Sequence, residues 1–150
     1  MCIISDDFAL TDLLPTVVAG ILAVGQWYWN AKIKERDARI DLSKRLENLL
    51  QITIEYPILE HQSVTETWKD NIESTEEKYL RYNQFCNMLF NFLAEVYDHF
   101  HGNKQKIEAF VDVKNWIRLH RQNWEYPSEP DANVDAYSEE FRSFINSYLH

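Results

Sequence analysis

Residues 13–29, LLPTVVAGILAVGQWYW, carry no charge and decide how the rest of the chain is organised. Three aspartates precede them and four basic residues follow closely. As a helix the stretch would extend about 26 Å, the short end of what a hydrocarbon core about 30 Å thick requires. Because basic residues accumulate on the cytoplasmic side of a span, this asymmetry predicts one transmembrane helix with its carboxyl end in the cytoplasm.

Both ends of the stretch carry residues typical of a membrane interface. Pro15 stands in the first turn, where a helix needs no N–H donor. Aromatic rings at the exit and the basic cluster behind them are expected to lie at the headgroups. These membrane-interface residues are Trp27, Tyr28, Trp29, Lys32, Lys34, Arg36 and Arg39.

Small residues recur at helical spacing inside the predicted span. Thr16 and Gly20 are four residues apart, and so are Ala19 and Ala23. Such pairs let helix backbones approach closely in lipid, and a polar side chain such as Gln26 also seeks partners there. The four small residues therefore predict self-association of the span.

Two other interpretations of residues 13–29 stay open. A cleaved signal peptide would begin with basic residues, whereas residues 1–12 carry only acidic ones. A buried core helix of a wholly soluble protein is the stronger competitor, because the stretch is short and includes Gln26.

The composition predicts an all-α protein. The 150 residues include only 3 Gly and 4 Pro, too few for the many tight turns of a β-sandwich or barrel. The 8 Phe, 8 Tyr and 5 Trp supply enough large rings for the core of one small domain. We expect an N-terminal transmembrane helix that continues into a cytoplasmic stem helix, then a small bundle of three or four helices.

Four parts of the chain follow from this interpretation. They are a short extracytoplasmic N-terminus (1–12), the transmembrane helix (13–29), a juxtamembrane stem helix (30–56) and a cytoplasmic helical domain (57–150). The stem contains neither Gly nor Pro, and Tyr56-Pro57 ends it, because proline and the residue before it cannot continue a helix.

Apolar spacing predicts three helices in the cytoplasmic domain, after an irregular or short helical connection at 61–71. A capping box that begins at Ser74 introduces a central helix, which Gly102 ends. A second helix is expected over 104–123, antiparallel to the first because the connection is short, and Ser138 caps the last. The side chains expected to face the core are Tyr82, Phe85, Cys86, Leu89, Phe92, Leu93, Val96, Phe100, Phe141, Phe144, Ile145 and Tyr148.

Charge and cysteine content exclude several kinds of function. From His61 onward nine basic residues face fifteen acidic ones, and such a domain would repel a nucleic acid. Cys2 and Cys86 are expected on opposite sides of the membrane, so they predict neither a disulfide nor a cysteine zinc site.

One cluster resembles a metal site. Glu95 and His99 are four residues apart, with His101 close behind, so a divalent ion is conceivable. Histidines near the end of a helix are also favoured by its dipole. Since no second matching motif exists, we predict no metal site.

One local basic and aromatic patch stands out. Arg118, His120 and Arg121, with Trp116 and Trp124 nearby, could grip a phosphate or an acidic partner. The interpretation that we prefer is pairing with the domain's own carboxylates. The chain has no Gly-rich phosphate loop, nucleophile elbow or Cys-His pair at useful spacing, so we predict no catalytic residue, cofactor or small-molecule substrate.

Several motifs give the chain a family resemblance. They are Tyr56-Pro57, the segment NMLFNF at 87–92, the paired tryptophans Trp116 and Trp124, and YSEEFRSFI at 137–145. In these the chain resembles uncharacterised prokaryotic single-pass membrane-anchored small helical proteins. The resemblance implies the same topology and supplies no catalytic residues.

The expected function is therefore not enzymatic. The sequence predicts a single-pass protein of the inner (plasma) membrane, with its N-terminus outside and its helical cytoplasmic domain binding another protein or further copies of itself, as an anchor or sensor. The alternative is a membrane-active effector, such as a toxin or phage-defence effector, whose spans oligomerise and perturb the bilayer.

Overall fold

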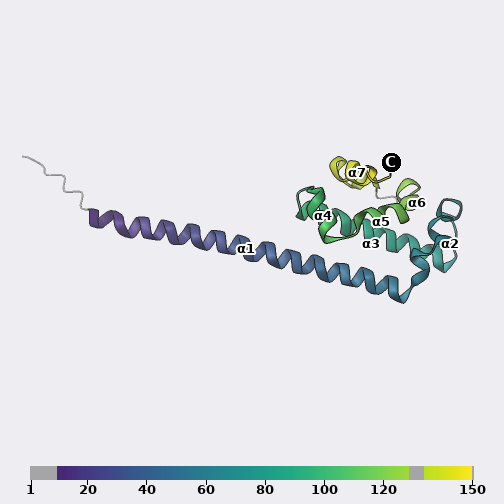
Figure 1. Ribbon diagram of the computed structural model, residues 1–150, viewed down its shortest axis with the longest axis horizontal. Coiled ribbons are helices and arrows are strands. Elements are labelled where there is room, and N and C mark those ends of the chain that lie inside the picture. The colour runs from purple at the N-terminus through teal and green to yellow at the C-terminus, as the bar shows by residue number, and fades with distance from the viewer. Residues whose placement is uncertain (1–9, 129–133, 150) are drawn as a thin grey trace, which may run out of the picture. The chain divides into compact units, whose positions relative to one another are not determined.

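The computed structural model describes residues 10–128 and 134–149, with side chains from Val18 onward, and every regular element in these residues is helical (Figure 1). The all-α class predicted from composition is confirmed. The elements are α1 (Leu10–Glu55), η1 (Pro57–Glu60), α2 (Gln62–Thr65), η2 (Trp68–Asn71), α3 (Glu77–His99), α4 (Lys104–Phe110), α5 (Val113–Leu119), α6 (Arg121–Glu125), η3 (Val134–Ala136) and α7 (Glu139–Asn146), where η denotes a short 3-10 helix.

The chain divides into two compact units, Met1–Ile40 and Asp41–His150. The described part of the first unit is the amino-terminal portion of α1. Among helices whose side chains are described, none combines the length and apolar character that crossing a membrane requires. The predicted span at 13–29 begins with residues 13–17, whose side chains lie outside the described part.

Helix α1 ends where the sequence predicts. Its last residue is Glu55, Tyr56 leaves the helical region at φ −126° and ψ 71°, and Pro57 opens η1. The N–H of Tyr56 still donates to the carbonyl of Ile52 at 2.8 Å. Proline has no N–H to extend this ladder, so the chain turns here.

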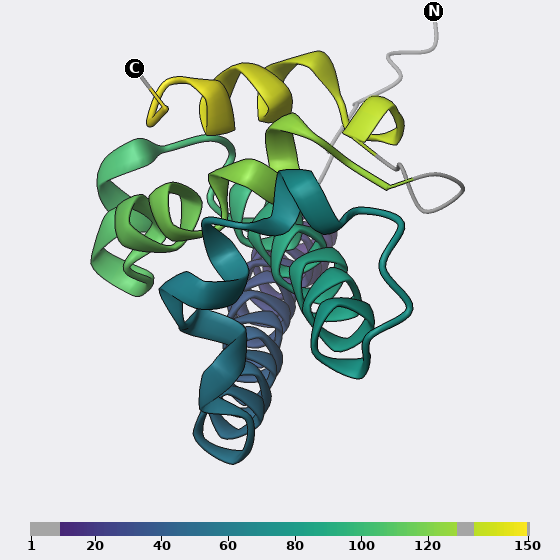
Figure 2. The same ribbon diagram turned by 90° about the vertical axis from the view of Figure 1, so that its right-hand side faces the viewer.

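Helix α3 runs through the middle of the second unit (Figure 2). Of its predicted core residues only Phe100 is partly rather than fully buried. The structure adds Tyr79, Asn83 and Phe90 to the buried set, because neighbouring segments cover more of the helix than one apolar stripe. The predicted start is wrong by two residues: Glu76 is the N-cap, and the Ser74 hydroxyl instead accepts from the Glu76 N–H at 3.2 Å.

The single helix predicted over 104–123 is wrong, since three short helices, α4, α5 and α6, occupy this region and run to Glu125. Val111 is extended at φ −144° and ψ 148°, and the Asp112 carboxylate caps α5 by accepting from the Asn115 N–H at 3.4 Å. Two breaks let the core-facing residues of all three helices reach the same interior: Ile107, Val113, Ile117 and Trp124 are all buried.

Helix α7 closes the second unit and follows the predicted pattern. Ser138 accepts from the Phe141 N–H at 3.2 Å and caps the helix. Phe141 packs edge-on against Tyr97 of α3, with ring centroids 5.6 Å apart, and also contacts Trp124. These ring contacts pack α7 against α3 and α6, so the three helices contribute to one aromatic core.

Candidate interaction groove

An open groove runs along α3 beside the last four turns of α1. It consists of two hollows of about 540 and 400 Å³, which share Met88. Leu49 and Phe92, both almost fully buried, form the apolar floor of the larger hollow. We call this feature the α1/α3 groove; it is lined by Arg45, Asn48, Leu49, Ile52, Tyr56, Leu59, Leu80, Arg81, Gln84, Phe85, Met88, Asn91, Phe92, Ala94, Glu95 and Asp98.

Two large apolar side chains of the groove are open to solvent. Leu80 is 54% exposed and Met88 is 48% exposed, and they lie two turns apart on α3. Anchors at one or two helical turns are what a groove offers to an amphipathic helix, and methionine adapts its shape to different partners.

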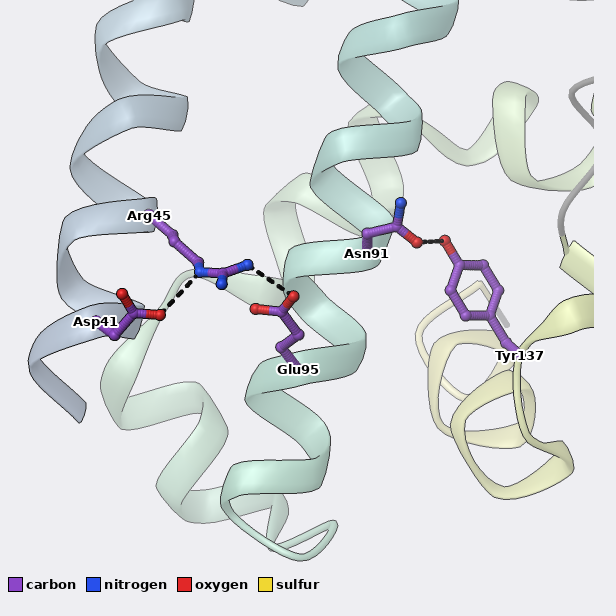
Figure 3. A network of polar contacts seen from close by, with 5 residues as sticks. All are labelled: Asp41, Arg45, Asn91, Glu95 and Tyr137. Atoms are coloured by element: carbon purple, nitrogen blue, oxygen red, sulfur yellow. Dashed lines mark hydrogen bonds and ion pairs between the residues drawn. The ribbon is translucent and has the colours of Figure 1, made fainter. Parts of the chain in front are cut away.

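The larger hollow has a rim of fixed charges (Figure 3). Arg45 donates from Nε to Asp41 at 3.0 Å and from Nη1 to Glu95 of α3 at 2.8 Å. One turn earlier on α3, the Asn91 side chain accepts from the Tyr137 hydroxyl at 2.7 Å. Since the arginine is shared by two carboxylates, this rim carries an excess of negative charge.

The smaller hollow ends at a second arginine. Arg81 forms an ion pair with Glu77 at 2.6 Å, and its guanidinium lies 4.5 Å from the centre of the Tyr56 ring. The second unit as a whole, residues 41–150, contains eleven basic and nineteen acidic residues, a net charge of −8. A basic partner is therefore electrostatically favoured over an acidic one.

The core contains a polar cluster that sequence reasoning missed. His120 Nδ1 lies 3.7 Å from the Cys86 sulfur and 3.3 Å from the Tyr82 hydroxyl, all within the core. Burial raises the pKa of the Cys86 thiol and of the Tyr82 phenol, and it lowers the pKa of His120 to about 3. A raised thiol pKa disfavours the thiolate, which is the nucleophilic form of cysteine, and a lowered imidazole pKa makes His120 a weak base toward it, so we interpret the contact as structural. The pair lies 34 residues apart in sequence, and only the tertiary structure joins it.

The basic and aromatic surface patch predicted around 116–124 does not exist as a unit. His120 and Trp124 are buried, and the Trp124 indole donates to Asn146 at 2.9 Å. The preferred pairing of Arg118 and Arg121 with carboxylates is wrong as well, because no ion pair joins them to an acidic group in the described residues.

The residues considered for a metal site are engaged elsewhere or exposed. Glu95 pairs with Arg45, and the His99 ring lies edge-on to Phe100 at 4.7 Å. His101 is exposed, in the positive-φ conformation at 52°. Among the side chains described, at 18–128 and 134–149, no three histidine, cysteine or acidic groups are placed to hold an ion.

The predicted interface and self-association residues of α1 are exposed wherever they are described. Trp27, Tyr28 and Trp29 are 72%, 54% and 65% exposed, and Lys32 lies over the Tyr28 ring at 5.1 Å. Lys34, Arg36 and Arg39 are also exposed, and Arg36 pairs with Asp37 at 3.6 Å. Ala19, Gly20 and Ala23 face solvent, with nothing within 4 Å of a Cβ added at Gly20, whereas the Thr16 side chain lies outside the described part.

These features define an all-helical protein with an exposed apolar helix segment and an acidic, apolar-floored groove. Comparison with family models, curated proteins and solved structures finds no match to the chain.

Proposed function

We propose that this chain is a single-pass protein of the inner membrane, with its N-terminus outside, whose helical cytoplasmic domain binds a partner protein through the α1/α3 groove and has no catalytic activity. The partner segment is an amphipathic helix with basic edges. The family resemblance of the sequence agrees with the topology and adds no mechanism.

The observation that carries the proposal is the distribution of exposed apolar side chains on α1. Between Val18 and Trp29, seven large apolar or aromatic side chains are 50–72% exposed, and no charged residue lies among them. At 100° per residue their directions cover about 220° of the helix circumference, and the remaining sector of this stretch carries Ala19, Ala23 and Gln26. One docking face would cover a narrower stripe, so the broad apolar surrounding that lipid supplies fits this pattern best.

The groove supports the second half of the proposal. Its exposed anchors, Leu80 and Met88, match the hydrophobic face of a helix, and its rims match basic edges. The walls are also fixed in advance: Arg45 ties α1 to Glu95 of α3, and Arg81 packs on Tyr56. Fixed walls reduce the entropy that is lost on binding.

Fractionation of the full chain, tagged at its carboxyl end, tests the membrane half. The wild type is expected to stay in carbonate-washed membranes with its tag protected from external protease. Ile21→Lys with Val24→Lys should release the chain, since each lysine costs about 3 kcal/mol near the centre of a span. Ile40→Lys is the matched control, because Ile40 is an exposed apolar residue of α1 outside the predicted span. Wild-type protein in the soluble fraction would refute the anchor.

Photo-crosslinking in cells tests the groove. A benzoylphenylalanine at Met88 or at Leu80 should form an adduct with the same polypeptide, whereas one at exposed Gln105 of α4 should not. With the probe at position 88, the adduct must disappear when Leu80→Glu is introduced in the same chain. Adducts of the chain with itself would identify a second copy as the occupant, and equal adducts at all three positions would refute a groove-specific partner.

The alternative, a membrane-active effector, has one favourable observation. Ala19, Gly20 and Ala23 form an exposed small-residue surface where two helix backbones could approach closely. For this function overexpression should depolarise cells, and Gly20→Leu should abolish the effect. Harmless overexpression would leave the anchor as the better proposal.

A further inference from the structure

A separate pocket of about 290 Å³ lies between α2 and the corner that joins α5 to α6, away from the α1/α3 groove. Its lining residues are Gln62, Thr65, Glu66, Arg118, Leu119, Arg121 and Gln122. Six of the seven are polar or charged, which is unusual for a ligand pocket, since most are lined chiefly by apolar groups.

Two arginines of this pocket have spare donors. Arg121 has no hydrogen bond or ion pair in the described part of the chain, and Arg118 uses only Nε, in a long contact of 3.5 Å to the Tyr148 carbonyl. Among the described residues no carboxylate forms an ion pair with either arginine, although acidic residues outnumber basic ones in this unit. A guanidinium offers five donors in a planar fork that matches the oxygens of a phosphate.

The walls of the pocket are held in place by contacts that leave the arginines free. The Gln122 amide donates to the Glu66 carbonyl at 2.7 Å and accepts from the Lys69 N–H at 3.0 Å, joining α6 to the end of α2. Nearby, the buried Trp68 indole donates to the Tyr126 carbonyl at 2.8 Å. The two sides of the pocket are therefore fixed relative to each other before any ligand arrives.

From this geometry we infer that Arg118 and Arg121 form a binding site for a small phosphate-bearing anion. Glu66 also lines the pocket, and its negative charge opposes an anion there, so the site binds one phosphate group rather than a polyphosphate. The phosphate can belong to a free small molecule or to a lipid headgroup. The site is independent of the proposed function.

Calorimetric titration of the full chain with inorganic phosphate, in nonionic detergent at low ionic strength, tests the inference. A dissociation constant of about 1 mM or lower is expected from two charge-assisted contacts. Arg118→Gln and Arg121→Gln should each weaken binding about tenfold or more, because each removes one charge-assisted contact. Glu66→Gln should tighten binding, because it removes the opposing charge.

Lys114→Gln is the matched control, since it removes one positive charge from exposed α5 without touching the pocket. It should leave phosphate binding unchanged, and circular dichroism should confirm that every variant keeps its helix content. An absence of saturable binding, or equal weakening by Lys114→Gln and the two pocket arginine variants, would overturn the site.

Nanodiscs distinguish the two sources of the phosphate. In phosphatidylcholine discs the chain should bind inorganic phosphate as it does in detergent. If phosphatidylglycerol in the discs suppresses that binding in the wild type, a headgroup occupies the site; if it does not, the ligand is a free small molecule. Loss of binding in both lipids would overturn the inference.

Discussion

Burial of His120 predicts a specific loss of stability in mild acid. The imidazole is fully buried against Cys86 and Tyr82, and its pKa in the folded protein is lowered to about 3 from an ordinary value of 6.5. In the unfolded chain the ring is solvated and titrates at its ordinary value. Between these two pH values the unfolded state binds the extra proton, so folding stability falls as the pH falls.

The size of the effect follows from the two pKa values. The contribution is fully present above about pH 6.5 and is lost progressively as the pH approaches 3. Linkage gives a loss of about 2 kcal/mol between pH 7 and pH 5 from this one group. With a urea m-value of about 2 kcal/mol/M, the unfolding midpoint should fall by about 1 M.

His120→Asn isolates this contribution. An asparagine amide can replace Nδ1 in the contact with Cys86 and Tyr82, but it does not titrate. The variant should be less stable at pH 7, because the smaller side chain leaves a cavity, and it should lose about 2 kcal/mol less than the wild type on going to pH 5.

Urea unfolding of the full chain in detergent, followed by near-ultraviolet circular dichroism, measures both quantities. The comparison uses the pH dependence within each protein, so the different starting stabilities cancel. Equal losses of stability in the wild type and His120→Asn would refute the assignment of a buried neutral imidazole.

Three further predictions concern stability at neutral pH, each checked by thermal or urea unfolding. Gly102→Ala should cost about 1–2 kcal/mol, because a φ of 69° is unfavourable for a residue with a Cβ and because the added Cβ would lie 2.9 Å from the Tyr97 hydroxyl oxygen. Gly25→Ala is the control: an added Cβ there has nothing within 4 Å, so this change should not destabilise the protein. Trp68→Phe should cost about 1–3 kcal/mol, since the buried indole hydrogen bond is lost, and an unchanged midpoint would contradict this. Arg45→Gln should cost less than about 1 kcal/mol, because both ion pairs are exposed, and a larger loss would show that the pairs are more than surface contacts.

Much of the helical organisation was predictable from local signals. The spacing of Leu89, Leu93 and Val96 placed one face of α3 in the core, and Tyr56-Pro57 marked the end of α1. Gly102 and Ser138 marked a helix end and a helix start through backbone conformation and capping, which depend on neighbours in the sequence. Such signals act within a few residues and are therefore visible without the fold.

Where two local signals competed, the sequence alone misled. The apolar spacing around Asp112 predicts one continuous helix, yet Asp112 is the N-cap of α5 and a new helix begins there. Trp68 lies among polar neighbours and is nevertheless 1% exposed, because other segments fold over it. Breaking a helix costs hydrogen bonds, and only the burial gained by turning each piece toward a shared core decides whether the break is favourable.

The sequence by itself determined the all-α class, the positions of α1, α3 and α7, and the uncharged segment between acidic and basic flanks, because composition and periodicity fix which residues can form helices and where charge accumulates. Only the tertiary structure joined Cys86 to His120, opened the α1/α3 groove beside Met88, and left Arg118 and Arg121 around a polar pocket. Those features depend on distances between segments far apart in the chain, which follow from how the side chains of the whole core pack together.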